Sequence, residues 1–455
     1  MNRVSSSYRD PAGFVIKDGG TYKRVVTPRG KQDYDSFISS GLNRELVKAR
    51  LLVGHEIEPS PELESQGGRL LVPEQIPFIS YPFEWSFDEL KDAALLTLEI
   101  QRRALERGFV LKDASAYNVQ FRGARAVFID TLSFTRYQGG PWVAYEQFCR
   151  QFLGPLLVLS YYSPDAARFL KADLEGFSLE RVSRLLPKRT YLQSGPLLHI
   201  HLHARAVRKR PSASRAVSTQ TAADLVCLTD SLHRAVEKIR TPSYAARWTN
   251  YYAEARFYPP EAQQAKREVV KELSSQLAPR LVFDLGANTG AFTREIASPG
   301  ALCIAFDSDP GCINRLYLEE RAKPQSNILP LVMDLANPSP PLGFELGSTL
   351  SLFERPQADL VMCLALMHHL RVRCNLPLAR IARFLSRLGR WLMIEFIPLT
   401  DPAINVLTSR LEDFDDYTLP SFLQCFTAHF ELRASRRLTA TGRAIYLFER
   451  LPCAA

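Results

Sequence analysis

The stretch LVFDLGANTG, residues 281–290, constrains the fold of this chain more than any other. Its first three residues form the apolar run of a buried strand, and Phe292 and Ile296 in the following segment are four residues apart, as on one face of a helix. A strand that leads into a helix through a glycine turn begins a βαβ unit, and such units bind nucleotides in several enzyme classes. The stretch therefore predicts a nucleotide-like ligand at the end of this strand.

The glycine pattern argues against two common types of nucleotide site. A dinucleotide site needs glycine at the first, third and sixth positions of the turn, where this chain has Gly286, Asn288 and Ala291. The Asn288 side chain obstructs the usual path of a pyrophosphate, which disfavours NAD and FAD. A P-loop fails as well, because no Gly-Lys-Ser/Thr follows.

Apolar runs and helical patterns alternate beyond residue 280, which predicts a parallel sheet with helices on both faces. We expect strands at 281–287, 301–307, 327–334, 358–366 and 390–398, and helices from about 289 and at 310–322, 375–389, 404–414 and 419–430. Two more strand-like runs, 430–440 and 442–450, surround a Thr-Gly turn and predict an antiparallel hairpin at the sheet edge.

Four motifs follow one another in this region: DLGANTG, AFDSDP, VMDLANP and ADLVMCLALMHHL. Together they resemble class I S-adenosylmethionine-dependent methyltransferases. The resemblance implies an α/β fold with a Rossmann-like seven-stranded sheet, and S-adenosylmethionine as cofactor. This cofactor carries no phosphate, so its loop, with Gly286, Asn288 and Gly290, needs close backbone approach rather than a phosphate cradle, and the two glycines allow that approach.

The ribose diol of such a cofactor needs a bidentate acceptor at the end of the second strand. Asp307 lies 21 residues after Gly286, about the separation found in analogous nucleotide folds. Asp309 is a weaker candidate, because it equally suits the cap of a helix that begins near Pro310.

Three more residues are expected at the cofactor by resemblance. Asp284 would hold the methionine end, and its alternative role is to pin the glycine loop. Asp334 would contact the adenine amino group, and its alternative is a cap or loop role. Leu364 follows the fourth strand, at the mouth of the expected pocket.

Ligands of parallel sheets lie beyond the carboxyl ends of the strands, where this chain has His368 and His369. We expect either histidine to contact the substrate or remove a proton; the alternative is packing and hydrogen bonding. Glu395 ends the fifth strand at the same mouth and is expected to orient an acceptor. Methyl transfer mainly requires a nucleophile held in line with the methyl carbon and the exclusion of water.

The N-terminal half contains a second informative stretch, LKDASAYNVQFRGARAVFID, residues 111–130. The spacing of Asp113, Asn118 and Asp130 resembles the catalytic loop and metal-binding aspartate of protein kinases and small-molecule phosphotransferases. By resemblance, Asp113 would act as the base and the other two would hold magnesium. Tyr-Lys-Arg at 22–24 lies in a plausible strand after a KDGG turn, but no glycine-rich loop precedes it and Asp-Thr-Leu replaces Asp-Phe-Gly.

We therefore expect an α+β, kinase-like N-terminal domain. The alternative is a recognition or scaffold domain in which these three side chains tie loops together. The whole layout, including GGPWVAYEQFC from Gly139, resembles a family of bacterial two-part methyltransferases that includes nodulation protein NoeA. The resemblance implies a small-molecule or glycan acceptor. An aromatic cluster caps the pocket or packs between domains: Trp248, Tyr251, Tyr252, Phe257 and Tyr258.

The predicted domains are 1–203 and 246–455, joined by a basic linker and a bridging helix in 204–245. Part of the net charge of +9 lies in the basic run HARAVRKRPSASR, residues 203–215, which suits a linker better than a nucleic-acid groove, and RNA stays an open partner. The rival functions are a phosphotransferase in the N-terminal half and a non-catalytic S-adenosylmethionine-binding scaffold.

Composition bounds the remaining possibilities. No apolar stretch approaches the ~18 residues of a membrane helix, and the N-terminus has no signal-peptide core, so we expect a cytoplasmic protein without a membrane partner. The eight cysteines form no C-x-x-C pair and no cluster with zinc spacing, which predicts free thiols and no metal in the C-terminal half. The oligomeric state is not determined by the sequence.

Overall fold

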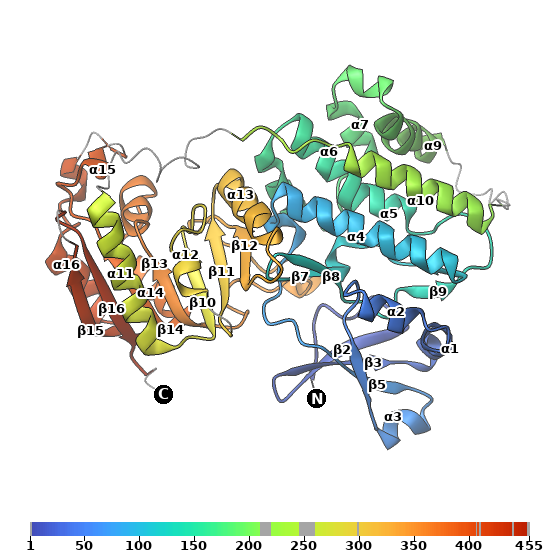
Figure 1. Ribbon diagram of the computed structural model, residues 1–455, viewed down its shortest axis with the longest axis horizontal. Helices are drawn as coiled ribbons and strands as arrows, with labels where there is room; N and C mark the ends of the chain where they lie inside the picture. Colours follow the sequence, from blue (N-terminus) through green and yellow to red (C-terminus); the bar gives the residue numbers. More distant parts are fainter. Residues whose placement is uncertain are drawn as a thin grey trace. The chain divides into compact units, whose positions relative to one another are not determined.

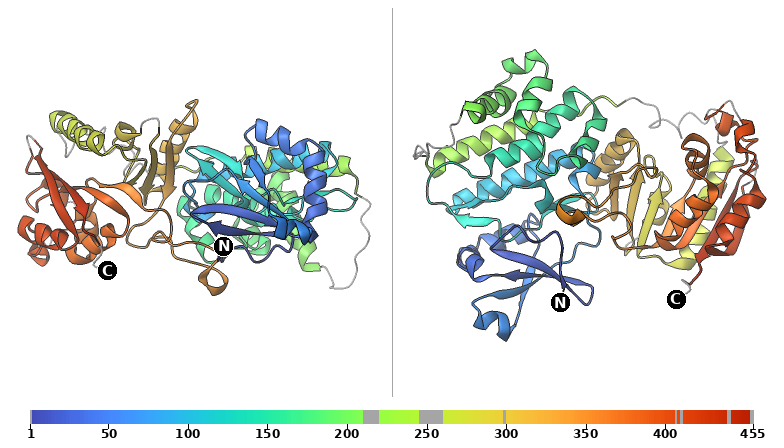
Figure 2. Two further views of the ribbon diagram at one scale, coloured as in Figure 1. Left: turned by 90° about the horizontal axis from the view of Figure 1, so that it is seen from below. Right: turned by 180° about the vertical axis from the view of Figure 1, so that it is seen from behind.

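The computed structural model describes residues 2–209, 220–244, 260–297, 300–405, 407–408, 411–438 and 441–452. These residues form two compact units (Figures 1 and 2). The first comprises Met1–Ser243 and Pro341–Thr349, and the second comprises Tyr244–Pro340 and Leu350–Ala455. The predicted aromatic cluster at 248–258 lies outside the described residues, as do residues 210–215 of the basic run.

The first unit begins with a five-stranded antiparallel sheet in the order β1-β2-β3-β5-β4. Its strands are β1 (Asn2–Arg3), β2 (Gly13–Asp18), β3 (Thr21–Val26), β4 (His55–Glu58) and β5 (Arg69–Pro73). The turn between β2 and β3 places Gly19 and Gly20 at positive φ (54° and 90°), as a two-residue hairpin turn requires. The predicted hairpin at KDGG is therefore confirmed.

Two short β-pairs follow the long helix α4 (Phe87–Glu106). They are β6 (Phe109–Leu111) with β9 (Phe134–Arg136), and β7 (Val119–Arg122) with β8 (Arg125–Phe128). Phe37 stacks on Phe134 with ring centroids 4.2 Å apart, so α1 packs against β9. The other helices of this unit are α1 (Pro28–Ser39), α2 (Leu42–Lys48), α3 (Pro61–Ser65), α5 (Tyr145–Phe148), α6 (Gly154–Tyr161), α7 (Leu179–Leu185), α8 (Ser194–Pro196), α9 (His203–Lys209) and α10 (Ala222–Glu237).

Helix α10 matches the helix expected in the bridging segment, and it packs on α4 inside the first unit. Thr221 caps this helix by accepting a hydrogen bond from the Asp224 backbone N–H. The division between the two units follows Ser243.

The second unit contains a seven-stranded sheet in the order β12-β11-β10-β13-β14-β16-β15 (Figure 1). The first five of these strands are parallel, and β16 and β15 close the sheet as an antiparallel hairpin. The predicted sheet and its terminal hairpin are thus confirmed. Its strands are β10 (Leu281–Leu285), β11 (Leu302–Asp307), β12 (Ile328–Val332), β13 (Ala358–Cys363), β14 (Gly389–Phe396), β15 (Phe430–Arg437) and β16 (Ala444–Arg450).

Helices cover both faces of this sheet. Alternate residues of β16 point to opposite sides, and each set contacts a different helix. Ile445 and Leu447 share a core cluster with Val270 of α11, whereas Tyr446 and Phe448 contact Phe422 of α16. The helices are α11 (Pro260–Leu277), α12 (Thr293–Ile296), α13 (Pro310–Arg321), α14 (Leu378–Ser386), α15 (Pro402–Asn405) and α16 (Leu419–Thr427).

Two helix predictions need correction. The helix expected from about residue 289 is only the short α12, because the preceding loop uses left-handed residues that do not fit a helix. The helix expected at 404–414 is interrupted: α15 ends at Asn405, and Leu411–Phe414 form a separate 3₁₀ turn. No helix in the described part of the chain has the length and apolarity needed to cross a membrane.

Candidate functional site

The glycine loop after β10 is held by alternating left-handed residues. Gly286, Asn288 and Gly290 have φ values of 76°, 53° and 77°. A Cβ atom on Gly290 would lie 2.6 Å from Leu316 Cδ1, so glycine is needed there for space as well as for conformation. A side chain on Gly286 would meet Leu366 at 3.3 Å. These contacts explain the glycine spacing seen in the sequence.

Hydrogen bonds join this loop to the end of β11. The backbone N–H groups of Gly286 and Ala287 both donate to Phe306 O, at 2.8 and 2.9 Å. The Asn288 N–H donates to Asp307 Oδ2 at 2.8 Å. The glycine loop and the predicted ribose acceptor therefore lie together at the carboxyl ends of neighbouring parallel strands.

Asp307 is half-buried and keeps spare acceptor capacity. Its Oδ1 accepts the Asp309 N–H at 2.9 Å, and the Ser308 backbone also bonds to this carboxylate, which can accept about four hydrogen bonds. Burial raises the pKa of Asp307, and the backbone donors oppose that rise. Asp309 itself caps α13 by accepting the N–H groups of Gly311 and Cys312, so the capping alternative holds for it.

Asp284 lies on β10 and is buried, with 3% of its surface exposed. Its Oδ2 accepts the Thr293 hydroxyl at 2.5 Å, which ties the strand to α12. Burial raises the pKa of Asp284 to about 6, although Thr293 and Lys266 both act to lower it. A buried carboxylate without a full counter-charge is costly, and a cationic ligand group would relieve this cost.

Glu395 is the centre of a buried ion-pair network, which the sequence analysis did not predict. Its Oε2 accepts from Lys266 Nζ at 2.6 Å, and its Oε1 lies 3.8 Å from Arg443 Nη1. Arg443 also makes a bidentate pair with Asp401, at 2.6 and 2.9 Å. Glu395 is 1% exposed, and its partners include these cations. Its predicted role in orienting an acceptor stays a prediction.

One signal for this network was present in the sequence. Lys266 stands four residues from both Ala262 and Val270, on the apolar face of α11. A lysine on such a face must find a buried anion, because burial penalises its charge and lowers its pKa. Its ammonium also lies 4.5 Å from the centre of the Phe292 ring.

The two histidines lie just after β13, with ring centroids 4.3 Å apart. His368 is 2% exposed, and its Nδ1 has no hydrogen-bond partner among the described residues. Burial lowers its pKa well below the usual range, with His369, Arg443 and Lys266 adding to the effect. Burial likewise lowers the pKa of His369 to about 4, so both rings are neutral at pH 7.

The last two predicted cofactor residues lie at the same end of the sheet. Asp334 follows β12 and accepts the Ala336 N–H at 3.0 Å, which is the loop role considered from the sequence. Leu364 follows β13 and is 5% exposed within the main core cluster. Their contacts with a cofactor stay predictions.

The three candidate residues of the first unit, Asp113, Asn118 and Asp130, lie in the loops that follow β6 and β8. Asp113 Oδ1 accepts from Ser115 N–H at 2.9 Å and from Gln147 Nε2 at 2.8 Å. Asn118 Nδ2 donates to Ser133 Oγ at 3.3 Å, and the Ser133 hydroxyl donates to Asp130 Oδ2 at 2.5 Å.

Arg24 of β3 completes this centre by forming an ion pair with Asp130. The sequence analysis placed Arg24 on a strand after the KDGG turn but did not indicate its partner.

No family model matches the chain. Its sequence is 32% identical to nodulation protein NoeA of Rhizobium meliloti (strain 1021) over 470 aligned residues, covering 98% of this chain and 96% of the relative. The chain belongs to the NoeA family.

Similar solved structures include three methyltransferases. Magnesium protoporphyrin IX methyltransferase of Synechocystis PCC 6803, with bound SAH, has 17% identity and a TM-score of 0.33, covering 45% of this chain and 96% of that one. N-methyltransferase NodS of Bradyrhizobium japonicum WM9 has 14% identity and a TM-score of 0.32, covering 42% and 98%. The bifunctional kinase-methyltransferase WbdD has 21% identity and a TM-score of 0.29, covering 41% and 39%.

Magnesium does not fit the N-terminal centre of this NoeA-family chain. Mg²⁺ needs oxygen ligands in near-octahedral geometry, but the Asp130 oxygens already contact Arg24, the Leu132 N–H and the Ser133 hydroxyl. Within the described residues, no group of three or more His, Cys, Asp or Glu side chains is arranged to hold a metal ion.

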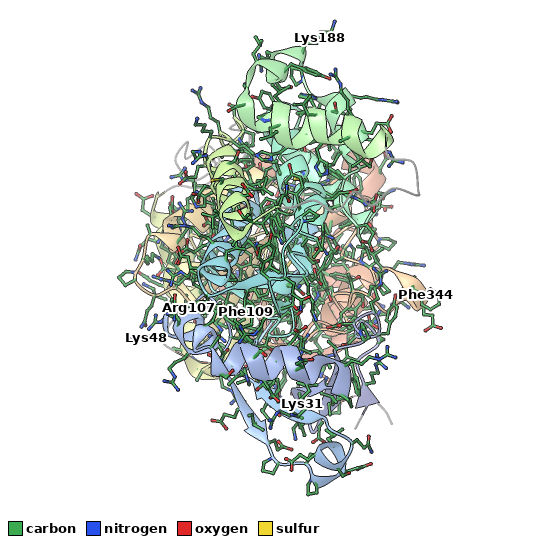
Figure 3. All side chains as sticks on the ribbon, turned by 90° about the vertical axis from the view of Figure 1, so that its right-hand side faces the viewer. Lys31, Lys48, Arg107, Phe109, Lys188 and Phe344 are labelled. Atoms are coloured by element: carbon green, nitrogen blue, oxygen red, sulfur yellow. The ribbon has the colours of Figure 1, made fainter. Side chains whose placement is uncertain are left out.

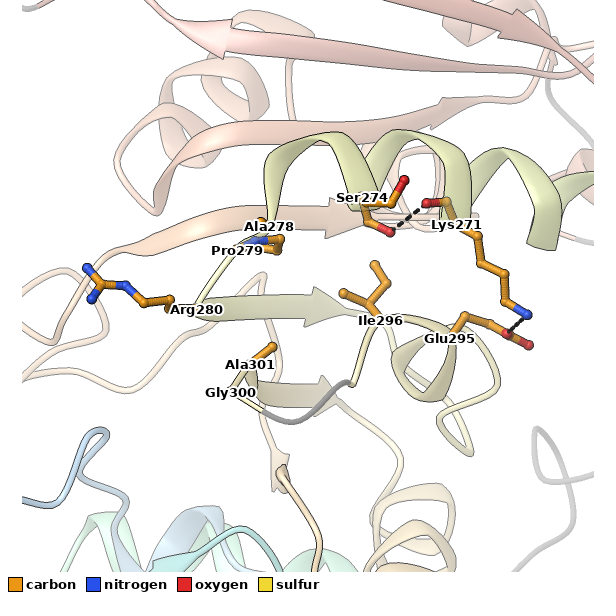
Figure 4. Close-up of a pocket in the computed structure, with 10 residues that line it drawn as sticks. Lys271, Ser274, Ala278, Pro279, Arg280, Glu295, Ile296, Gly300 and Ala301 are labelled. Carbon is orange, nitrogen blue, oxygen red and sulfur yellow. Dashed lines mark hydrogen bonds and ion pairs between the residues drawn. The ribbon is translucent and has the colours of Figure 1, made fainter.

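A hollow of about 610 Å³ lies at the opposite end of β10 and β11 from the glycine loop (Figure 4). Arg280 and Ala301, which immediately precede these strands, line it together with Ile296, and the Lys271–Glu295 ion pair of 2.7 Å borders it. Ligands of parallel α/β sheets bind at the carboxyl ends of the strands, so this hollow is not the predicted cofactor site.

The basic side chains labelled on the first unit in Figure 3 are partly neutralised by neighbours. Lys31 pairs with Asp35 at 2.7 Å, and Arg107 pairs with Glu45 at 2.9 Å. Paired charges of this kind weaken the case for a phosphate-binding surface, and RNA binding by this NoeA-family chain stays untested.

Proposed function

We propose that the second unit transfers a methyl group from S-adenosylmethionine to an acceptor, for which a small molecule or a glycan is favoured. The observation that carries the proposal is the hydrogen bond between Asn288 N–H and Asp307 Oδ2. It brings the left-handed glycine loop and the acidic end of β11 to one place, next to the switch point between β10 and β13. The four motifs that resemble class I methyltransferases support the same function.

The described residues suit each part of this cofactor. The half-buried carboxylate of Asp307 accepts backbone N–H groups and keeps acceptor capacity for the ribose. The backbone of Gly286 and Gly290 allows adenosine to approach closely. Asp284, a buried acid beside the loop, supplies the counter-charge for the amino group of the methionine portion.

The bound cofactor supplies an activated methyl group on a sulfonium, so the protein need not activate the leaving group. The task of this chain is to hold an acceptor in line and to keep water away. We assign His368 or His369 the removal of a proton from the acceptor, because both rings are neutral at pH 7. The Lys266–Glu395–Arg443 network ties α11 to the end of β14 and to the start of β16.

Isothermal titration of the full chain with S-adenosylmethionine tests the proposal. We expect binding in the wild type and a loss of about 100-fold in affinity in Asp307→Ala, because two hydrogen bonds to a charged acceptor are removed. Asp415→Ala, at an exposed aspartate, is the matched control and should bind as the wild type does. Absence of affinity in the wild type would refute the assignment.

Cofactor binding without turnover would instead support the scaffold alternative. To separate the two, the protein is incubated with methyl-labelled cofactor and fractions of bacterial extract. Label in small molecules or glycans supports the favoured acceptors, and label in RNA or protein replaces them. Label in no fraction, with binding intact, indicates a scaffold. We also propose a cytoplasmic location, which fractionation of cells tests.

We further propose that the first unit is kinase-like. Its order of elements supports this: a sheet with two helices between β3 and β4, the long α4, then β6, the Asp113–Asn118 loop, the β7–β8 hairpin, Asp130 and β9. An experimental structure of the first unit tests the proposal.

A further inference from the structure

The N-terminal centre contains a fixed cation in addition to its acidic and amide side chains. Arg24 lies in β3, which pairs with β2 on one side and β5 on the other, so its backbone is held in the middle of a sheet. The Arg24 guanidinium reaches Asp130, which follows β8. Their side chains are 21% and 9% exposed.

Protein donors occupy both oxygens of Asp130. Oδ1 contacts Arg24 and accepts the Leu132 N–H at 3.1 Å, and Oδ2 accepts the Ser133 hydroxyl at 2.5 Å. The same Ser133 oxygen accepts from Asn118 Nδ2 at 3.3 Å. The two residues that resemble metal ligands are therefore tied to each other and to an arginine.

The charge of Arg24 is permanent under physiological conditions. Burial lowers its pKa to about 10, with Asp10 and Asp113 acting in the opposite direction, so the group stays protonated near neutral pH. A divalent cation entering beside Asp130 would meet this positive charge and would have to displace it. The charge that a metal would supply is already present.

We propose that Arg24 is a built-in cation that takes the place of a divalent metal at Asp130, so that the first unit carries out no metal-dependent phosphoryl transfer. The connection between β2 and β3 supports this proposal independently. It is the two-residue turn Gly19–Gly20, so it does not contain the G-x-G-x-x-G loop that covers the phosphates in protein kinases.

Binding of Mn²⁺ to the full chain, followed by electron paramagnetic resonance of the free ion, tests the proposal. In Arg24→Gln the carboxylate of Asp130 is released, and we expect Mn²⁺ affinity to rise about tenfold or more over the wild type. The gain should disappear in Arg24→Gln/Asp130→Asn. Arg69→Gln, which removes an ion pair with Asp35 in the same unit, is the matched control and should produce no gain. A folded Arg24→Gln protein without increased affinity overturns the proposal.

A second measurement needs no variant. ATP is titrated into the wild type with millimolar MgCl₂ and again with EDTA. Equal heats under both conditions, or no binding in either, support the proposal. Binding of ATP that magnesium strengthens about tenfold or more overturns it.

Discussion

Asp284 offers a test that links the stability of the second unit to its proposed cofactor. The carboxylate is 3% exposed, and burial raises its pKa from 3.8 to about 6. Asp284→Asn keeps an oxygen that can accept the Thr293 hydroxyl but removes the buried charge. We expect the variant to be more stable than the wild type at pH 8 and to lose affinity for S-adenosylmethionine.

The direction of the pH dependence follows from proton binding. Because the folded state holds the proton of Asp284 more tightly than the unfolded state, this group favours folding fully below pH 3.8 and loses that contribution as pH rises to 6. The difference between the two pKa values corresponds to about 3 kcal/mol. This value already includes the attraction of Lys266, and it is an upper value for the gain in the variant, since the amide N–H₂ group of Asn is itself buried and needs an acceptor.

Thermal and denaturant unfolding of wild type and variant from pH 8 to pH 4 measures the effect. The stability difference should approach about 3 kcal/mol above pH 6 and vanish toward pH 4. Asp415→Asn, at an exposed aspartate, should follow the wild type throughout. A variant less stable than the wild type at pH 8, or a difference that does not change with pH, would refute the reasoning.

Three further predictions concern the same unit. Lys266→Met leaves the buried Glu395 with only Arg443, at 3.8 Å, of these two cations, and should lower the free energy of unfolding by about 3–5 kcal/mol. In denaturant unfolding, Lys266→Met/Glu395→Gln should recover part of the lost stability, and equal losses in the two variants would contradict the ion-pair argument. Gly290→Ala should cost about 1–3 kcal/mol through positive φ and the clash with Leu316, and an unchanged melting temperature would argue against that loop geometry. If His369 accepts the proton, turnover at saturating cofactor should stay constant from pH 8 to about 5 and fall near pH 4, where the ring becomes charged; an inflection near pH 6.5 would exclude it.

Local patterns predicted most of the second unit. The five parallel strands and the closing hairpin follow from apolar runs separated by turns, because burial on both faces of a sheet requires such runs. The spacing of Gly286, Gly290 and Asp307 predicted a shared site, and the hydrogen bond from Asn288 brings them together. The helix after the glycine loop was overestimated, because sequence spacing did not reveal that Asn288 is left-handed.

The sequence alone determined the order of strands and helices and the position of the glycine loop, since these depend on neighbouring residues. Only the tertiary structure decided which charges are buried together. Lys266 and Glu395 are far apart in the chain but 2.6 Å apart in space, and Arg24 likewise reaches Asp130. Such pairs depend on how strands and helices pack. A buried charge requires an oppositely charged partner, and the residues next to it in the sequence do not indicate which one.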